Sequence, residues 1–317
     1  MKNKKIVILG TGGTIAGTAS EVGDNLGYTA AQLGIEQLVA ALPPRQGDLP
    51  FTHVTEQVAQ VDSKDMDFGV WGQLANRVIH LLGQADVQGI VITHGTDTLE
   101  ETAWFLQTLL NPDKPVVLTC AMRPATALAP DGPQNMVDAI AVARHVGARG
   151  VMVVCAGVIH GAQDVQKVHT YRLDAFSSGD AGPLGYVEEG RLRLLRAWPL
   201  VADQAARVPV NIVTLADAAS WPRVEIIMNH AGAGAAMVEA LVKDGVNGLV
   251  VAGTGNGTLH HALEKALLEA QAKGVHIVRS TRCLAGRVIP KADDVLPDSQ
   301  GLSPVKARVS LLLSLMD

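Results

Sequence analysis

Short apolar runs recur along the chain, and each is followed by a turn and then by a segment with helical spacing. The runs cover residues 5–10, 89–93, 115–121, 150–157, 223–228, 248–253 and 276–280. They are rich in Val and Ile and are continuous rather than alternating, which is typical of strands buried on both faces of a parallel sheet. Intervening segments such as ETAWFLQTLL place apolar residues three and four apart, as crossover helices do. The pattern predicts an α/β protein with two open, mostly parallel sheets and flanking helices.

The length and the distribution of prolines suggest where one domain ends. At roughly 150 residues per domain, 317 residues fit two domains. The stretch at 197–222 lacks a clean periodic pattern and is expected to be a connector, with room for an added strand. We therefore expect a larger N-terminal α/β domain over 1–196 and a smaller C-terminal α/β domain over 223–317.

Composition narrows the function classes. The net charge is −5, aromatic residues make up 3%, and no basic block is present. Nucleic-acid binding requires clustered cations and often aromatic stacking surfaces, so we expect no nucleic-acid partner. The N-terminal apolar run is too short for a signal peptide or a membrane span, which favours a cytoplasmic protein, or a periplasmic one if a leader was removed. The cysteines at 120, 155 and 283 form no pattern typical of disulfides, and two of them are expected to be buried inert thiols.

The first apolar run ends in the glycine-rich segment GTGGTIAG, residues 10–17. Open α/β sheets bind ligands at the carboxyl ends of their strands, so the hydroxyl of Thr14 is a candidate functional group, held at the surface by a turn. The alternative is a dinucleotide-binding turn, but G-x-G-x-x-G starting at Gly10 would need glycine where Ile15 stands. A threonine in such a turn is, on this segment alone, most often a turn or cap residue.

A second strand runs into HGTDTLEETAWFL, residues 94–106. Thr98 and Glu101 have the spacing of a capping box, so a helix is expected to begin near Thr98. Thr96 and Asp97 would then lie between the strand end and the helix start, where backbone N–H groups favour negative charge. Since Thr98 would cap the helix, Asp97 would be free to face a ligand.

A hydroxyl nucleophile needs a base, and Lys167 in HGAQDVQKVHTYRLDAF is one candidate. A lone lysine is usually solvated, so the sequence leaves this choice open. Metal catalysis is not expected, because no H-E-x-x-H or H-x-x-x-H pattern occurs. His260 and His261 are expected to point to different faces of a helix, and His94 is expected to brace the turn before Gly95.

Four segments in chain order, GTGGTIAG, ITHGTDTLEETAWFL, AMRPATALAPDGPQN and AGTGNGTL, resemble the bacterial-type L-asparaginase and glutaminase-asparaginase family. The similarity extends over nearly the whole chain and is greater to the exported, type II branch. It implies that Thr14 is the nucleophile that forms an acyl-enzyme, and that Tyr28, in a lid, orients it. It also implies that Lys167 polarises Thr96 on the water or oxyanion side of the reaction, and that Asp97 binds the substrate ammonium.

The same resemblance implies a substrate pocket and an assembly. Ser63 corresponds to a residue that holds the substrate carboxylate, and the backbone of Ala121 lines the site. Asn256 corresponds to a residue contributed by a neighbouring subunit, which implies a homotetramer built from intimate dimers. No cofactor is implied.

This sequence departs from the family pattern at three places. Lys64 stands where a neutral side chain is usual, and we expect it either to turn outward or to bind the substrate carboxylate. The family's glutamate from the neighbouring subunit has no clear counterpart, and the region offers Lys291, Asp293 and Asp294 instead. The cysteines of the exported branch's disulfide are also missing, which agrees with a reducing compartment.

These observations predict hydrolysis of L-asparagine to L-aspartate and ammonia, with secondary glutaminase activity. One alternative is an amidase component that acts on aminoacyl-tRNA, although the chain has no spare segment for RNA binding. Another is a non-catalytic amino-acid-binding sensor, which would have no use for two activated threonines.

Overall fold

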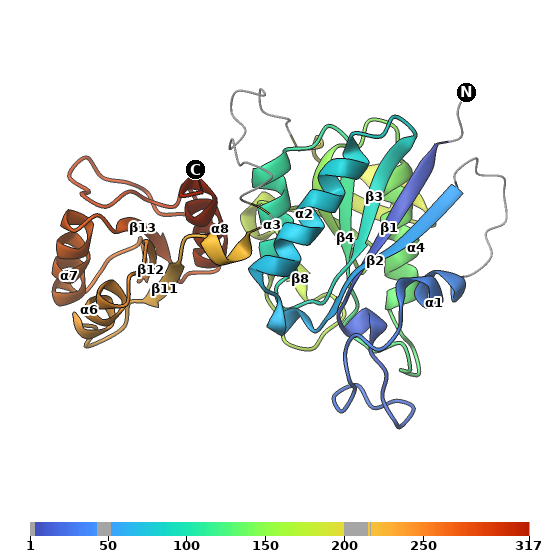
Figure 1. Cartoon of the computed structure of the whole chain (residues 1–317), viewed down its shortest axis with the longest axis horizontal. Coiled ribbons are helices and arrows are strands. Elements are labelled where there is room, and N and C mark those ends of the chain that lie inside the picture. The colour runs from blue at the N-terminus through green and yellow to red at the C-terminus, as the bar shows by residue number, and fades with distance from the viewer. Residues whose placement is uncertain (1–3, 43–51, 200–214, 216, 317) are drawn as a thin grey trace. The chain divides into compact units, whose positions relative to one another are not determined.

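The computed structural model describes residues 4–42, 52–199, 215 and 217–316, and it divides into two compact units, Met1–Arg207 and Val208–Asp317. The predicted α/β class with two largely parallel sheets is confirmed (Figure 1). Residues 200–214 and 216 of the predicted connector lie outside the described residues, and so does any strand that they contain.

The first unit is built on an eight-stranded sheet in the order β10-β9-β6-β5-β4-β3-β1-β2. The strands β1 to β5 are parallel, and β6, β9 and β10 run antiparallel. The strands are β1 Lys5–Gly12, β2 Thr52–Val61, β3 Val87–Thr93, β4 Pro115–Thr119, β5 Gly150–Cys155, β6 Val158–Gly161, β9 Gly185–Glu188 and β10 Arg191–Leu194. The short strands β7 Gln166–Lys167 and β8 Phe176–Ser177 form a separate ribbon.

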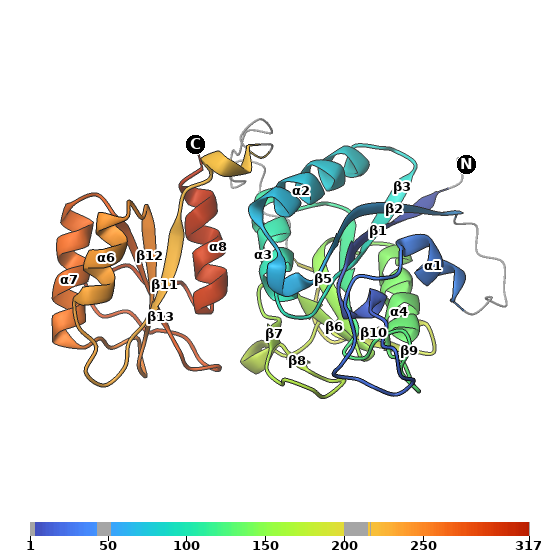
Figure 2. The same cartoon turned by 60° about the horizontal axis from the view of Figure 1, so that its bottom comes forward.

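Helices cover both faces of the large sheet (Figure 2). They are α1 Ile35–Ala40, α2 Phe68–Leu82, α3 Leu99–Leu110 and α4 Gly132–Arg144. Successive side chains of a strand point to opposite faces of the sheet. On one face, Ile6 and Ile8 of β1 pack in the buried cluster that includes Ile35 of α1 and Met136 of α4. The central strands β4 and β5 are buried along their whole length and β3 at every position except Gln88, as their apolar runs predict.

The sequence pattern did not predict β2 or the antiparallel strands. The β2 sequence THVTEQVAQV has no continuous apolar run, because the strand lies at the sheet edge and much of it is exposed. Edge strands with polar side chains avoid pairing with other chains, so the absence of an apolar signal has a physical cause.

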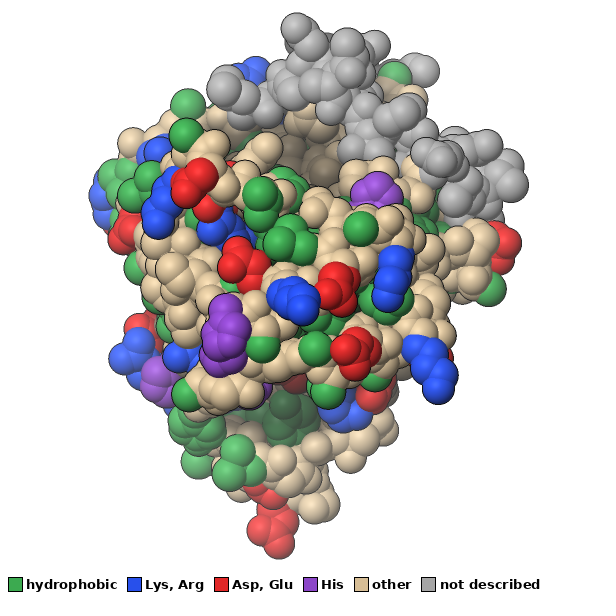
Figure 3. All heavy atoms as spheres, turned by 90° about the vertical axis from the view of Figure 1, so that its left-hand side faces the viewer, with side chains coloured by type: hydrophobic (Ala, Val, Ile, Leu, Met, Phe, Trp, Pro, Cys, Tyr) green, Lys and Arg blue, Asp and Glu red, His purple; other side chains and the backbone are tan. Residues whose placement is uncertain are grey.

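The second unit has a three-stranded parallel sheet in the order β11-β12-β13, formed by Val224–Met228, Gly248–Gly253 and His276–Thr281. The helices α6 Ala236–Lys243 and α7 His261–Ala272 cover one face, and α8 Pro304–Ser314 covers the other (Figure 2). On the face that Figure 3 presents, acidic, basic and histidine side chains are interspersed with hydrophobic ones.

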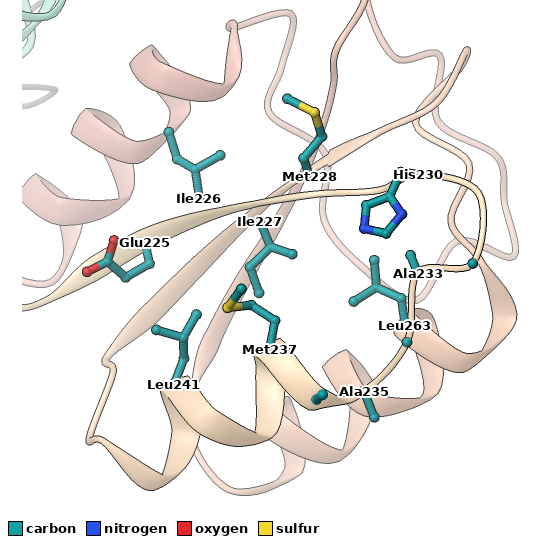
Figure 4. Close-up of a pocket in the computed structure, with 13 residues that line it drawn as sticks. Glu225, Ile226, Ile227, Met228, His230, Ala233, Ala235, Met237, Leu241 and Leu263 are labelled. Carbon is teal, nitrogen blue, oxygen red and sulfur yellow. The ribbon is translucent and has the colours of Figure 1, made fainter.

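A groove of about 690 Å³ lies between the edge strand β11 and α6. Met237 and Leu241 of α6 face Ile227 of β11 across it (Figure 4). Met228 and Met237, which also line it, are 57% and 61% exposed. The second unit therefore presents apolar side chains beside β11, the outermost strand of this sheet among the described residues.

The adjacent histidines of α7 correct one expectation. His260 and His261 do not point to different faces, since their rings stack with centroids 4.3 Å apart. His260 precedes the helix as its N-cap, in an extended conformation, and its ring accepts a hydrogen bond from the N–H of Ala262. Because His260 lies outside the helix, helical spacing does not set the direction of its side chain relative to that of His261.

Candidate active site

The order of the strands places two chemistry-bearing loops side by side. The strand β1 lies between β2 and β3, so the chain runs from β1 to one neighbour and returns on the other side. In open α/β sheets such a switch point leaves a crevice at the carboxyl ends of the strands, where ligands bind. Here the loop after β1 carries Thr14, and the loop after β3 carries Thr96 and Asp97.

Two glycines allow these loops to touch. Gly13 has φ +82°, a conformation open to glycine, and a methyl group there would overlap the backbone of Gly95 and lie 2.9 Å from the carbonyl carbon of His94. A methyl group on Gly95 would lie 2.7 Å from Cβ of Ser63 and 3.1 Å from Cα of Gly13. The two threonine loops can thus approach this closely only because Gly13 and Gly95 have no side chain.

Thr14 begins a short 3-10 helix, η1, at Thr14–Ala16. Its side chain is not at the surface as expected, since the residue is only 8% exposed. The Tyr28 hydroxyl lies 2.7 Å from its Oγ1, and the Tyr28 ring packs against Gly17. Backbone bonds between Thr18 and Thr29 close the base of the intervening lid segment. The lid therefore brings the Tyr28 hydroxyl within hydrogen-bond distance of the candidate nucleophile, Thr14, and covers that residue.

The second threonine has a cationic partner. Lys167 Nζ donates to Thr96 Oγ1 at 2.8 Å and to Asp97 Oδ1 at 2.6 Å. The Lys167 side chain is 20% exposed, and the Asp97 side chain is 52% exposed. The short β7–β8 ribbon holds the lysine backbone through the pairing of Lys167 with Phe176. The lysine is therefore paired and largely buried, and about half of the Asp97 side chain stays exposed to solvent.

Ser63 lies against this second loop. Its Oγ accepts the N–H of Asp97 at 3.1 Å, and its carbonyl oxygen accepts the hydroxyl of Thr98 at 2.8 Å. Accepting a bond uses only a lone pair, so the Ser63 hydroxyl proton can be donated to a substrate carboxylate. The side chain of Lys64, in contrast, is 62% exposed and pairs with Asp65. That hydrogen bond raises the pKa of Lys64, which takes the outward of its two expected positions.

Thr98 has a different role from the one its spacing predicts. It is the N-cap residue of α3, so the helix start is confirmed, but it makes no side-chain capping bond. Its hydroxyl donates to Ser63 instead. The capping-box interpretation is therefore wrong: the hydroxyl points to a long-range acceptor and makes no bond to the first turn of α3.

Ala121 follows β4 and is fully buried in the cluster that contains Ile15 of η1. The segment after it is held by the carboxylate of Asp131, which accepts the N–H groups of Met122 and Arg123 at 2.9 and 3.0 Å. The structure thus holds the backbone next to Ala121 with two hydrogen bonds and places it near the Thr14 loop.

Asn256 belongs to the second unit, whereas Thr14 and Thr96 belong to the first. Its amide donates to the carbonyl of Ile289 and accepts the N–H of Ile289 at 2.7 Å, which fixes the side chain. Asp294 pairs with Arg279, and this bond keeps the pKa of Asp294 below its ordinary value. Asp294 is thus committed to an ion pair, which argues against it as the counterpart of the family's glutamate.

Sequence patterns did not identify the buried chain of hydrogen bonds behind the Thr96 loop. Trp71 Nε1 donates to Thr102 Oγ1 at 2.9 Å, and this oxygen lies 2.9 Å from Nε2 of His94. Nδ1 of His94 lies 2.7 Å from the carbonyl oxygen of Gly95. Burial lowers the pKa of His94 to about 4, so the ring is neutral at pH 7. The only signal for this contact was the position of His94 next to the turn.

The two buried cysteines are neighbours. The sulfur atoms of Cys120 and Cys155 lie 3.6 Å apart, and both thiols are free. The hydrogen bond with Cys155, together with burial, raises the pKa of Cys120, so this thiol is a poor nucleophile at neutral pH. Within the described ranges, His, Cys, Asp and Glu side chains form no group of three that could hold a metal ion.

Family comparisons agree with this geometry. The family model "Asparaginase, N-terminal" matches residues 5–200, and the model "Glutaminase/Asparaginase C-terminal domain" matches residues 223–317. The chain belongs to the asparaginase family. Its relatives include L-asparaginase 2 of Bacillus subtilis (strain 168), which is 39% identical over 98% of this chain and 82% of the relative. Glutaminase-asparaginase of Pseudomonas fluorescens biotype A is 36% identical over 99% of this chain and 87% of the relative.

One solved structure has nearly the same fold. The crystal structure of a probable cytoplasmic L-asparaginase from Campylobacter jejuni matches with a TM-score of 0.89 and 38% identity, covering 98% of this chain and 95% of that one. The resemblance indicated by the four motifs is thus confirmed over nearly the full length of this chain. No helix in the described part of this chain has the length and apolar character to cross a membrane.

Proposed function

We propose that this protein hydrolyses the side-chain amide of L-asparagine to L-aspartate and ammonia through an acyl-enzyme on Thr14. Secondary hydrolysis of L-glutamine is part of the proposal, since relatives named glutaminase-asparaginase are 35 to 36% identical to this chain.

The observation that carries the proposal is a pair of threonines on touching loops, each with its own partner. Thr14 is hydrogen-bonded to Tyr28 at 2.7 Å, and Thr96 to Lys167 at 2.8 Å. A binding protein needs no such pairing, whereas covalent amide hydrolysis needs a nucleophile with a base and then an activated water.

In the first half of the reaction, Thr14 Oγ1 attacks the amide carbon and gives its proton to the Tyr28 hydroxyl, while the proton of that hydroxyl passes to the amide nitrogen. The carbon–nitrogen bond then breaks, and the nitrogen leaves as ammonia. Backbone N–H groups of the two loops are proposed to stabilise the oxyanion, and one such donor lowers the barrier by about 3–4 kcal/mol in other hydrolases. The product of this half is an ester between Thr14 and the aspartyl group.

In the second half, water attacks the ester, and Thr14 leaves with its proton restored. Thr96 and Lys167 serve this water or oxyanion side. Lys167 Nζ is held between Thr96 Oγ1 at 2.8 Å and Asp97 Oδ1 at 2.6 Å, so Asp97 keeps the lysine aligned with the Thr96 hydroxyl.

Substrate choice follows from the two charged ends of a free amino acid. Asp97 pairs with the α-ammonium, and Ser63 donates to the α-carboxylate. A peptide lacks this pair of charges, so the site selects a free amino acid. The backbone of Ala121 lines the pocket, and Lys64 lies at its margin, paired with Asp65.

The active protein is proposed to be a homotetramer of intimate dimers, in which Asn256 of a neighbouring subunit completes each site. Apolar side chains along the groove between β11 and α6 support self-association, because a soluble chain gains free energy by covering them. Light scattering of the purified protein should give four chains, and Met237→Glu should lower that number while Met237→Leu should not. A monomeric wild-type protein with full activity would refute the shared site.

The protein is further proposed to act in the cytoplasm, the compartment named for the solved Campylobacter jejuni relative. Its functional division is proposed to be a catalytic domain over 1–196, a connector over 197–222 and a C-terminal domain over 223–317.

Ammonia release from asparagine, glutamine and a blocked peptide amide tests the proposed function. We expect the highest kcat/KM with asparagine, lower activity with glutamine and none with the peptide amide. Release from none of the three would refute the activity. Thr14→Ala should lower kcat at least a thousandfold, and an unchanged rate in that variant would refute the assignment of the nucleophile while leaving the activity intact.

A further inference from the structure

His94 lies at the junction between β3 and the loop that carries Thr96. The residue is fully buried, and both of its ring nitrogens are within hydrogen-bond distance of a partner. On one side is the carbonyl oxygen of Gly95, which belongs to the peptide bond that leads into Thr96. On the other side is the hydroxyl of Thr102, on α3.

The chemistry of the partners fixes the direction of every bond in this chain. A carbonyl oxygen only accepts, so Nδ1 of His94 carries the proton and donates to Gly95. Nε2 of the neutral ring is then an acceptor, and the Thr102 hydroxyl donates to it. Trp71 Nε1 can only donate, and it supplies the bond that Thr102 Oγ1 accepts. The chain thus runs in one direction from Trp71 through Thr102 and His94 to the Gly95 carbonyl.

The outer end of this chain is rigid. The Trp71 ring, on α2, stacks on Phe105 of α3 with centroids 4.7 Å apart and an angle of 13° between the planes. Trp71, Thr102 and Phe105 are buried. The inner end is crowded, because Gly95 touches Gly13 and Ser63. The hydrogen-bonded chain therefore connects the packed α2–α3 layer to a loop whose backbone has little room to move.

Lys167 contacts both functional side chains of the loop, but the backbone beside each is held by a different group. The N–H of Asp97 is bonded to Ser63, and its carboxylate to Lys167. The peptide before Thr96 is held through the Gly95 carbonyl by His94. Loss of the His94 bond should therefore disturb the orientation of Thr96 more than that of Asp97.

We propose that His94 is a positioning residue for the hydrolytic reaction: it fixes the Gly95–Thr96 peptide so that the Thr96 hydroxyl stays aligned with Lys167, and Thr102 and Trp71 fix His94. This inference rests on the proposed role of Thr96. It predicts an effect on kcat with a smaller effect on KM, since the ammonium-binding Asp97 has its own supports.

Thr102→Val tests the proposal, because valine keeps the shape and removes the hydroxyl that orients His94. We expect kcat to fall about tenfold to a hundredfold, the cost of a small misplacement of a reacting group, while KM changes less than threefold. Thr102→Ser restores a hydroxyl and should recover most of kcat. Thr108→Val is the matched control: it lies in the same helix, and its buried hydroxyl has no hydrogen-bond partner among the described residues. It should keep wild-type kcat.

A spectroscopic readout accompanies the kinetics. In ¹⁵N NMR spectra, His94 of the wild type should appear as the neutral tautomer protonated at Nδ1, and Thr102→Val should broaden or shift its signals while Thr102→Ser preserves them. If Thr102→Val is too unstable to purify, Thr102→Ser and His94→Gln provide the same comparison. A wild-type kcat in Thr102→Val, or a change confined to KM, would overturn the proposal. A separate variant tests the proposed role of Thr96: full activity in Thr96→Val would contradict that role.

Discussion

Replacing Gly13 with alanine should separate the two threonine loops. Gly13 adopts φ +82° and ψ −174°, a region nearly restricted to glycine, and holding alanine there costs about 1–3 kcal/mol. The new methyl group would also overlap the backbone of Gly95, and relieving such an overlap in a packed region costs about 1–3 kcal/mol more. The free energy of unfolding should therefore fall by about 2–6 kcal/mol.

The effect on activity should be greater than the effect on folding suggests. Relief of the overlap moves the Thr14 loop away from the Thr96 loop, and a displacement of about 1 Å at a reacting group costs about a hundredfold in rate. Urea denaturation measures the change in stability, and ammonia release from asparagine at saturating substrate measures kcat. Both should be recorded at a temperature where the variant is fully folded.

Gly147→Ala is the control for backbone strain. Gly147 has a similar φ of +84°, and a methyl group there would meet nothing within 4 Å. This variant should lose about 1–2 kcal/mol from the left-handed conformation and keep full activity. If Gly13→Ala and Gly147→Ala lose the same stability and both keep wild-type kcat, the contact between the two loops is not what the reaction depends on.

Three further predictions follow from single contacts. Lys167→Met should lower kcat by about a hundredfold or more by removing the group that polarises Thr96, and a rate within threefold of wild type would contradict this role. His94 stays neutral in the folded protein down to pH about 4, whereas its unfolded form takes up a proton below 6.5, so stability should fall by about 3 kcal/mol as the pH drops between these values. In urea titrations of His94→Gln, the free energy of unfolding should no longer show this decrease between pH 6.5 and about 4. If it depends on pH as steeply as in the wild type, His94 is not the source of the decrease. Thr126→Val removes the acceptor of the Ala19 N–H at the start of the lid, and should raise KM for asparagine about threefold to tenfold, while an unchanged KM would show that this bond does not hold the lid.

The central parallel strands could be predicted because they are buried on both faces. The β12 sequence GLVVAG, for example, has an apolar or small residue at every position, and every position is buried. The edge strand β2 has no such constraint, since solvent covers much of it, and its polar sequence resembles a loop. The antiparallel strand β10, with the sequence RLRL, was missed for the same reason.

The residues of the site could be named from motifs, but their physical state could not. The sequence left open whether Lys167 is solvated or paired, and that depends on a contact with Thr96 across 71 positions of the chain. The same holds for Thr98, whose local spacing predicts a cap and whose hydroxyl goes to Ser63. Side chains with long-range partners follow the fold and not the local pattern, which is why the chain through Thr102 was also missed.

The central claim is that Thr14 carries the acyl group. Lys167→Met slows the water step, so mixing this variant with asparagine and quenching with acid should trap the intermediate for peptide mass spectrometry. The account predicts a mass increase of one asparagine less one ammonia, located on the peptide that contains Thr14 and absent from Thr14→Ala. An adduct on Thr96, or steady ammonia release with no adduct on Thr14, would contradict it.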